Sequence, residues 1–228
     1  MLLRLSGLDV RPGSSVEQIL VRDNRVAGVA LKGGEEVATP IVVSALDPRR
    51  TMLELADPGW LDPELARSIR HIRCRGTAGR LTLELDRPPG FARLVHAPSL
   101  DYLERAYDDA KHGRPSAQPC LEACWDGGTR VEIDVQFAAE APDAALGLLA
   151  PRLGRAAVKA RQWIPATQVP ASAELTLDQA LWRRPHPDLA AYHTPIAGLW
   201  LCGDSMHPGD RIAGAAGFNC ARGILRSA

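Results

Sequence analysis

The chain has 228 residues, 46% of them hydrophobic, and its 27 basic and 27 acidic side chains give a formal net charge of zero. This length and composition predict a globular protein with one large or two small domains. The balanced charge offers no global field for nucleic acid or an anionic membrane, so neither is an expected partner. The apolar N-terminal patch is too short for a transmembrane segment and is interrupted by charges, which predicts a cytoplasmic protein.

Five cysteines are scattered along the sequence: Cys74, Cys120, Cys124, Cys202 and Cys220. Their odd number suits free thiols in a reducing compartment better than a disulfide framework. Cys120 and Cys124 form a close pair, but no second pair follows to complete the four ligands of a structural zinc site. We therefore predict no metal site.

The first fifty residues predict strands joined by turns. Alternation of apolar and polar residues around Asp23-Asn24 in VEQILVRDNRVAGVAL is typical of a β-hairpin. A turn at Gly33-Gly34 leads to IVVSALDP, whose β-branched run, ended by Asp47-Pro48, indicates an inner strand of an α/β sheet. Helices are expected near residues 49–55 and between residues 61 and 72.

The middle of the sequence has an antiparallel character. Strict alternation in GRLTLELDRPPG places Leu81, Leu83 and Leu85 on one face of a half-buried strand. A second hairpin is predicted where Gly127-Gly128 separates PCLEACWD from TRVEIDVQF. Residues 102–111 are too polar to assign. One or two helices are predicted in DAALGLLAPRLGRAAVKA, and a short helix in ELTLDQALWRRPHP.

The strongest candidate for a ligand site lies near the C-terminus. An apolar strand ends at Leu201, and Asp204 follows at its carboxyl end, where open α/β sheets place their ligands. Beyond a turn, a helix opens with small residues, and its free N–H groups and dipole favour an electron-rich, partly anionic group. The alternative is that Gly214 and Gly217 only allow tight helix packing and that Asp204 is an exposed cap.

Two further clusters carry weaker hypotheses. Ser205 and His207 lie beside Asp204, but without a Gly-x-Ser-x-Gly elbow they give little support to a hydrolase. The run Arg183-Arg184-Pro185-His186 could bind an anionic substrate, although a solvated basic turn is the better interpretation. The catalytic residues stay unknown.

The closing segment combines a Leu-Asp-Gln helix, an Arg-Pro, a Thr-Pro-x-x-Gly-Leu strand, a His-Pro-Gly turn and a Gly-rich helix, in LTLDQALWRRPHPDLAAYHTPIAGLWLCGDSMHPGDRIAGAAGFNCARGIL. In this order the segments resemble the C-terminal half of the phytoene-desaturase-like flavoproteins, in the FAD-dependent amine oxidase and phytoene dehydrogenase superfamily. The stretch VEQILVRDNRVAGVALKGGEEVATPIVVSALDP is similar to mid-chain strands of the same family. The resemblance implies an FAD-dependent oxidoreductase acting on an organic small molecule of apolar or amine-bearing character.

The resemblance also implies which residues bind the cofactor. Asp204, after Gly203, would contact the ribityl or pyrophosphate part of FAD. The start of the last helix would face the pyrimidine edge of the flavin, and the backbone of Val16 would lie beside the adenine. The implied cofactor-binding residues are Gly203, Asp204, Ile212, Ala213, Gly214 and Val16. The chain departs from the family pattern at Asp210-Arg211 and Ala213, where relatives usually have glycines and a proline.

Flavoproteins of this kind hold the pyrophosphate on a βαβ unit with Gly-x-Gly-x-x-Gly, and no Gly-x-Gly occurs in this sequence. We therefore expect FAD to be shared with a partner chain, an N-terminal half-flavoprotein subunit that carries this motif. The chain would be a natural split subunit, a truncated gene or a fragment. The competing hypothesis is a non-catalytic scaffold or binding subunit, a flavoprotein remnant that no longer binds FAD.

The expected fold class is a mixed α/β (α+β) structure. Residues 1–50 and 190–228 would form the C-terminal part of a Rossmann-like FAD-binding domain, without its dinucleotide-binding βαβ unit. Residues 51–189 would form a substrate-binding domain around an antiparallel sheet.

Overall fold

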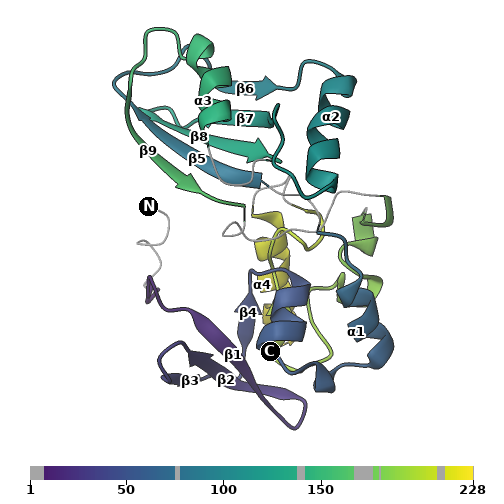
Figure 1. Ribbon diagram of the computed structural model, residues 1–228. Coiled ribbons are helices and arrows are strands. Elements are labelled where there is room, and N and C mark those ends of the chain that lie inside the picture. Colours follow the sequence, from purple (N-terminus) through teal and green to yellow (C-terminus); the bar gives the residue numbers. More distant parts are fainter. Residues whose placement is uncertain are drawn as a thin grey trace. The chain divides into compact units, whose positions relative to one another are not determined.

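The computed structural model describes residues 8–74, 78–137, 142–166, 177–179, 181–209 and 214–227. The chain divides into two compact units (Figure 1). The terminal unit consists of Met1–Cys74 and Ala171–Ala228, and the central unit of Arg75–Pro170. The class is mixed α/β, as predicted from the sequence. From the sequence, residues 51–74 and 171–189 were expected in the substrate-binding domain, whereas here they group with the two ends of the chain.

The terminal unit begins with an antiparallel sheet of strands β1 (Val16–Arg22), β2 (Arg25–Leu31) and β3 (Glu36–Ala38). Asp23 and Asn24 form the turn between β1 and β2, with φ angles of 51° and 56°. Short polar side chains tolerate this left-handed conformation, which matches the twist of a two-residue hairpin. The predicted hairpin is confirmed.

A two-stranded parallel sheet joins the two ends of the sequence in this unit. Strand β4 (Val42–Ser44) pairs with β10 (Leu199–Leu201), and Ser44 lies opposite Leu201. Because the strands are parallel, their carboxyl ends meet at one edge. Helix α4 (Ala215–Ser227) packs against β10, since a Cβ atom added to Gly223 would lie 3.1 Å from the Trp200 ring.

Helix α1 (Pro63–Arg70) has the predicted start. The Oδ1 atom of Asp62 accepts hydrogen bonds from the backbone N–H groups of Glu64 and Leu65, at 2.8 and 3.3 Å. The other helical segments of the unit are short: a π-helical segment at Arg50–Leu55 and 3-10 turns at Pro58–Trp60, Leu177–Gln179, Leu181–Arg183 and Pro187–Leu189. The buried core includes Ile19, Val26, Met52, Ile69, Ile196, Leu199 and Met206.

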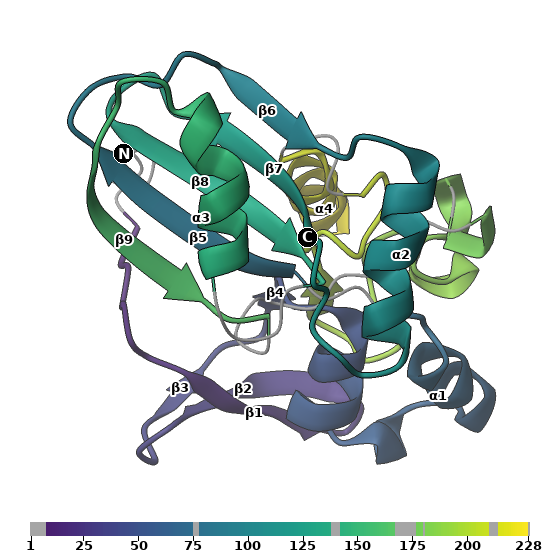
Figure 2. The ribbon, with the colours of Figure 1, turned by 45° about the horizontal axis from the view of Figure 1, so that its top comes forward.

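The central unit is built on a five-stranded antiparallel sheet in the order β6-β7-β8-β5-β9 (Figure 2). Its strands are β5 (Ala78–Leu85), β6 (Arg93–His96), β7 (Cys120–Trp125), β8 (Arg130–Gln136) and β9 (Val158–Ile164). Leu81, Leu83 and Leu85 are buried on one face in a core shared with α3 (Asp143–Leu149), as the alternation predicted. A 3-10 turn at Ala150–Arg152 follows α3.

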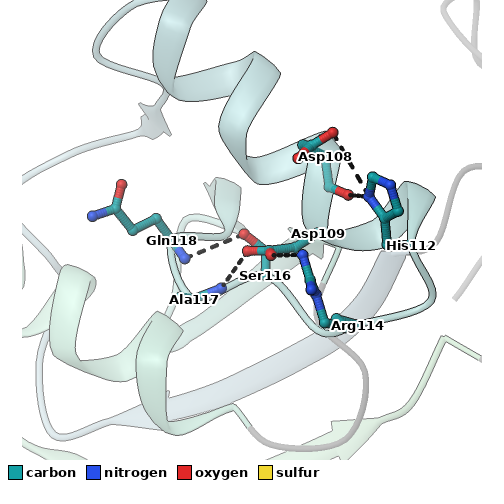
Figure 3. A network of polar contacts seen from close by, with 7 residues as sticks. All are labelled: Asp108, Asp109, His112, Arg114, Ser116, Ala117 and Gln118. Atoms are coloured by element: carbon teal, nitrogen blue, oxygen red, sulfur yellow. Dashed lines mark hydrogen bonds and ion pairs between the residues drawn. The ribbon is translucent and has the colours of Figure 1, made fainter.

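Helix α2 (Leu100–Lys111) occupies the segment that the sequence left unassigned. Beyond it, polar contacts fix the loop that leads to β7 (Figure 3). Carboxylate oxygens of Asp109 accept from Arg114 Nη2 at 3.3 Å and from the backbone N–H of Ala117 at 3.4 Å. The Nδ1 atom of His112 lies 2.8 Å from the carbonyl oxygen of Asp108. These contacts join the last turn of α2 to the loop that follows it, so we assign them a structural role.

One prediction for the central unit was wrong. Helical structure was expected through the end of DAALGLLAPRLGRAAVKA, but Val158 begins strand β9, which pairs with β5 at one edge of the sheet. The sequence did not predict strand β6 either. Across the described ranges, no helix has the length and apolar character that crossing a membrane requires.

Candidate functional site

The candidate site lies at the edge where β4 and β10 end. The backbone N–H of Cys202 donates to the carbonyl oxygen of Ser44 at 2.8 Å, which carries the pairing one residue beyond β10. Gly203 then passes so close to the chain after β4 that an added Cβ atom would overlap the carbonyl oxygen of Ala45. Glycine is required at position 203 because the two backbones meet there.

Several polar groups at the end of β4 and in the segment after it bond to one another. The hydroxyl oxygens of Ser44 and Thr51 lie 2.7 Å apart, and both residues are buried. The Oδ1 atom of Asp47 accepts from the backbone N–H groups of Arg49 and Arg50, at 3.0 and 3.3 Å. Asp47 therefore caps the following helical turn.

Asp204 differs from Asp47 in its exposure. The residue is exposed, while its backbone is held in place by hydrogen bonds. Its carbonyl oxygen accepts from Arg184 Nη2 at 2.8 Å and from Arg184 Nε at 3.3 Å. The loop also has internal backbone hydrogen bonds. Met206 N–H donates to the carbonyl oxygen of Gly203 at 2.9 Å, and Gly209 N–H donates to the carbonyl oxygen of Met206 at 2.7 Å. An exposed carboxylate on a fixed backbone can accept hydrogen bonds from ligand hydroxyls without a large ordering cost.

Arg184 corrects an interpretation made from the sequence. A solvated basic turn was expected at residues 183–186, but Arg184 is only 1% exposed, whereas Arg183 is exposed. Burying a guanidinium is costly unless acceptors satisfy it, and the Asp204 carbonyl oxygen supplies one. The adjacent arginines therefore have different roles, which their sequence does not distinguish.

Among the described residues, nothing packs against the two glycines at the start of α4. Gly214 has a φ of 76°, and its carbonyl oxygen accepts the first helical bond, from Phe218 N–H at 2.9 Å. No described atom lies within 4 Å of a Cβ atom added to Gly214 or to Gly217. The tightly packed glycine of α4 is Gly223, so these distances give no support to the view that Gly214 and Gly217 serve helix packing.

Val16, a further predicted residue, lies in the three-stranded sheet of the terminal unit. Val16 starts β1, where it is half-buried and lies opposite Leu31. Ile212 and Ala213 lie outside the described residues.

Two residues that the sequence did not single out connect the loop to the helix. The Tyr192 hydroxyl donates to the carbonyl oxygen of His207 at 2.9 Å, and Asn219 Nδ2 donates to the Tyr192 oxygen at 3.0 Å. Asn219 belongs to α4, so the loop and the helix are linked through one phenol. No spacing rule marks Tyr192 and Asn219 as a pair.

Two cysteines of the terminal unit, Cys202 and Cys220, are poor nucleophiles. Burial raises the pKa of the Cys202 thiol. Burial, with a smaller effect of Cys202, raises the pKa of Cys220 to about 11. The structure describes all five cysteines, and none of them forms a disulfide. Within the described ranges, no cluster of three or more His, Cys, Asp or Glu side chains is placed to hold a metal ion.

The chain is similar to two proteins that are named for an oxidoreductase domain. Pyridine nucleotide-disulfide oxidoreductase domain-containing protein 2 of Rattus norvegicus is 28% identical over 262 residues, covering 90% of this chain and 44% of the rat protein. The Mus musculus protein of the same name is 26% identical with the same coverage. The chain thus spans less than half the length of these relatives. No protein-family model matches it.

Among solved structures, an oxidoreductase from Methanosarcina mazei has the same fold over 95% of this chain and 49% of its own, with a TM-score of 0.50 and 15% sequence identity. At this identity the likeness concerns the fold alone. It confirms the mixed α/β class and leaves the division of roles between the two units as a prediction.

Proposed function

We propose that the chain forms part of the flavin-binding site of an FAD-dependent oxidoreductase that takes hydride equivalents from an organic small molecule. One observation carries the proposal: an exposed carboxylate on a fixed loop at the ends of two parallel strands, followed by a helix with an open, small-residue first turn. The similarity to the rat protein, which is named for an oxidoreductase domain, supports this proposal. The resemblance to phytoene-desaturase-like flavoproteins makes the reading specific for FAD.

The described residues fit a flavin nucleotide. Asp204 is exposed and can accept from ribityl hydroxyls. The first N–H groups of α4 lack acceptors within the helix, and the dipole there favours the electron-rich edge of the ring. No side chain at Gly214 or Gly217 obstructs the approach of a flat ring, and no described neighbour fills that space. Bound flavin would supply the hydride acceptor, and this chain would orient it.

The pyrophosphate cradle is missing from this sequence, and we propose that another stretch of polypeptide provides it, on a partner chain or on a longer form of this one. The rat and mouse relatives are more than twice the length that this chain matches, which is compatible with such a unit. In this proposal the terminal unit contributes to FAD binding, and the central unit, with its antiparallel sheet, binds the substrate.

Two substitutions test the site in the protein that includes the dinucleotide-binding unit. Asp204→Asn should weaken FAD binding by about 1–3 kcal/mol through lost hydrogen bonds. Gly217→Leu should abolish FAD retention, because the branched side chain would occupy the open space at the first turn of α4. Gly217 is preferable to Gly214, whose φ of 76° would strain any replacement.

The measurement is flavin fluorescence titration, with the free energy of unfolding determined for the FAD-free variants. Glu36→Gln is the control. Glu36 is exposed on β3 and remote in sequence from the site, so this variant should leave the affinity for FAD unchanged. If both site variants bind FAD as tightly as the parent protein, the terminal segment has a packing role and the proposal fails.

A further inference from the structure

Arg184 is a buried charge whose guanidinium binds the backbone of the candidate site. Two of its nitrogens converge on one acceptor, the Asp204 carbonyl oxygen, at 2.8 and 3.3 Å. The guanidinium is a rigid fork, so two bonds to one oxygen define the direction as well as the distance of that oxygen. The residue that presents the exposed carboxylate is thereby fixed through its main chain.

The far end of the loop rests on the same side chain. Gly209 has a φ of 100°, and a Cβ atom added there would lie 3.3 Å from Arg184 Nε and 3.7 Å from its Cζ. Asp204 and Gly209 therefore both approach one guanidinium. Since Arg184 is 1% exposed, it has almost no surface through which a ligand could touch it.

A second side chain, that of Tyr192, holds the middle of the loop in place. The Tyr192 hydroxyl donates to His207 and accepts from Asn219 on α4, so it uses both its donor and an acceptor position. Tyr192 is 8% exposed. Its own backbone is anchored to the sheet, because Leu201 N–H donates to the Tyr192 carbonyl oxygen at 2.8 Å. The phenol therefore sets the distance between the loop, β10 and α4.

From this geometry we infer that Arg184 and Tyr192 are positioning residues of the cofactor site: they fix the 203–209 loop against β10 and α4, so that the Asp204 carboxylate and the open helix start meet one ligand together. The inference rests on the proposed function. Neither side chain contacts the cofactor, and both act through backbone carbonyl oxygens. FAD affinity should therefore depend on two residues that the ligand does not touch.

The first test measures the loop without any cofactor. Arg184→Lys keeps the charge but loses the fork, and Tyr192→Phe loses only the hydroxyl. Each should raise hydrogen exchange of the Met206 and Gly209 amides, by about tenfold or more, because their bonds within the loop open more often. Arg183→Lys is the matched control: the same replacement at an exposed neighbour should leave this exchange unchanged.

The second test uses the protein with its dinucleotide-binding unit and titrates FAD against the folded variants. Losing hydrogen bonds that hold the loop should raise the Kd for FAD about tenfold to a hundredfold in Arg184→Lys, less in Tyr192→Phe, and not in Arg183→Lys. Were Arg184→Lys unable to fold, Tyr192→Phe would decide, since it removes one hydroxyl only.

The outcomes separate the inference from the proposed function. Unchanged exchange and unchanged Kd in stable variants would overturn the positioning role, even if the parent protein binds FAD tightly. Lower stability alone, with normal exchange of the loop amides and normal affinity in the folded fraction, would also overturn it. A parent protein that binds no FAD would reject the proposed function and the cofactor role of both residues, whatever the exchange result.

Discussion

At the residue scale, Gly203 is a position where the terminal unit has no room for a side chain. Gly203→Ala would force a methyl group against the Ala45 carbonyl oxygen, so the chain after β4 or β10 must shift. We expect a loss of about 1–3 kcal/mol in the free energy of unfolding, typical of overpacking. Urea denaturation of the purified protein measures it.

The matched control is Gly217→Ala, in the first turn of α4. No described atom lies within 4 Å of its added Cβ atom, and alanine is the better helix former. This variant should be neutral or more stable by up to about 1 kcal/mol. Equal losses in the two variants would show that the close approach at Gly203 does not limit substitution.

Thiol reactivity gives an independent check of burial. Because burial raises the pKa of Cys220 to about 11, its thiol stays protonated at neutral pH, and the thiolate is the reactive form. Iodoacetamide should therefore label the exposed Cys124 first and Cys220 last, as followed by mass spectrometry of the native protein. Labelling of Cys220 as fast as Cys124 would contradict the packing of α4 on β10.

At the element scale, the pairing of β9 with β5 depends on Asp86. Its Oδ1 atom accepts from Ala157 N–H at 2.8 Å, and its own N–H donates to the Ala157 carbonyl oxygen at 2.9 Å. The hydrogen bond from Arg87, followed by that from Ala157, lowers the pKa of Asp86 from 3.8 to about 2. The ionised carboxylate is thus the form that the folded state prefers.

This shift predicts a pH-dependent effect of Asp86→Asn. Since the folded pKa lies below the ordinary value of 3.8, the contribution of Asp86 is fully present above that value and is lost as the pH falls to about 2. The variant should be less stable than the parent at about pH 7, with the difference shrinking at about pH 3. A difference that grows on acidification would contradict the assignment. Arg87→Gln should raise the pKa of Asp86, as carboxyl NMR would show.

The elements that the sequence predicted correctly have strong local signals. Alternating leucines identify β5, the Asp23-Asn24 turn identifies the β1–β2 hairpin, and Asp62 marks the start of α1. Strand β9 was missed because its first five residues are exposed, so no alternation appears in an edge strand. Helix α2 was left unassigned because it buries little more than Ala106.

The candidate site was predictable only in part, for a physical reason. Gly203, Asp204 and the helix start follow one another in sequence, so a local pattern can find them. Arg184 and Tyr192 act through backbone oxygens of residues far along the chain, and an arginine in a basic run looks solvated until its burial is known. A hydrogen bond to a distant backbone oxygen does not depend on the type of the accepting residue, so it produces no recognisable motif in the sequence.

At the scale of the whole molecule, the terminal unit exposes apolar groups on the elements that form the site. Ile41, directly before β4, is 42% exposed, and Val43 within β4 is 46% exposed. Phe218 on α4 is 63% exposed. Among the described residues, β4 pairs along one edge only, with β10. These features suit a surface that further polypeptide covers, and we expect the chain by itself to self-associate.

The central claim is that this chain holds one part of an FAD site and depends on a dinucleotide-binding unit for the rest. The decisive measurement is the flavin content after gel filtration, from absorbance in the flavin bands, for the chain alone and for the chain with the polypeptide that carries that unit. We predict little or no FAD on the chain alone, and about one FAD per soluble, yellow assembly when the unit is present. Stoichiometric FAD on the chain alone, or none on the assembly, would contradict the account.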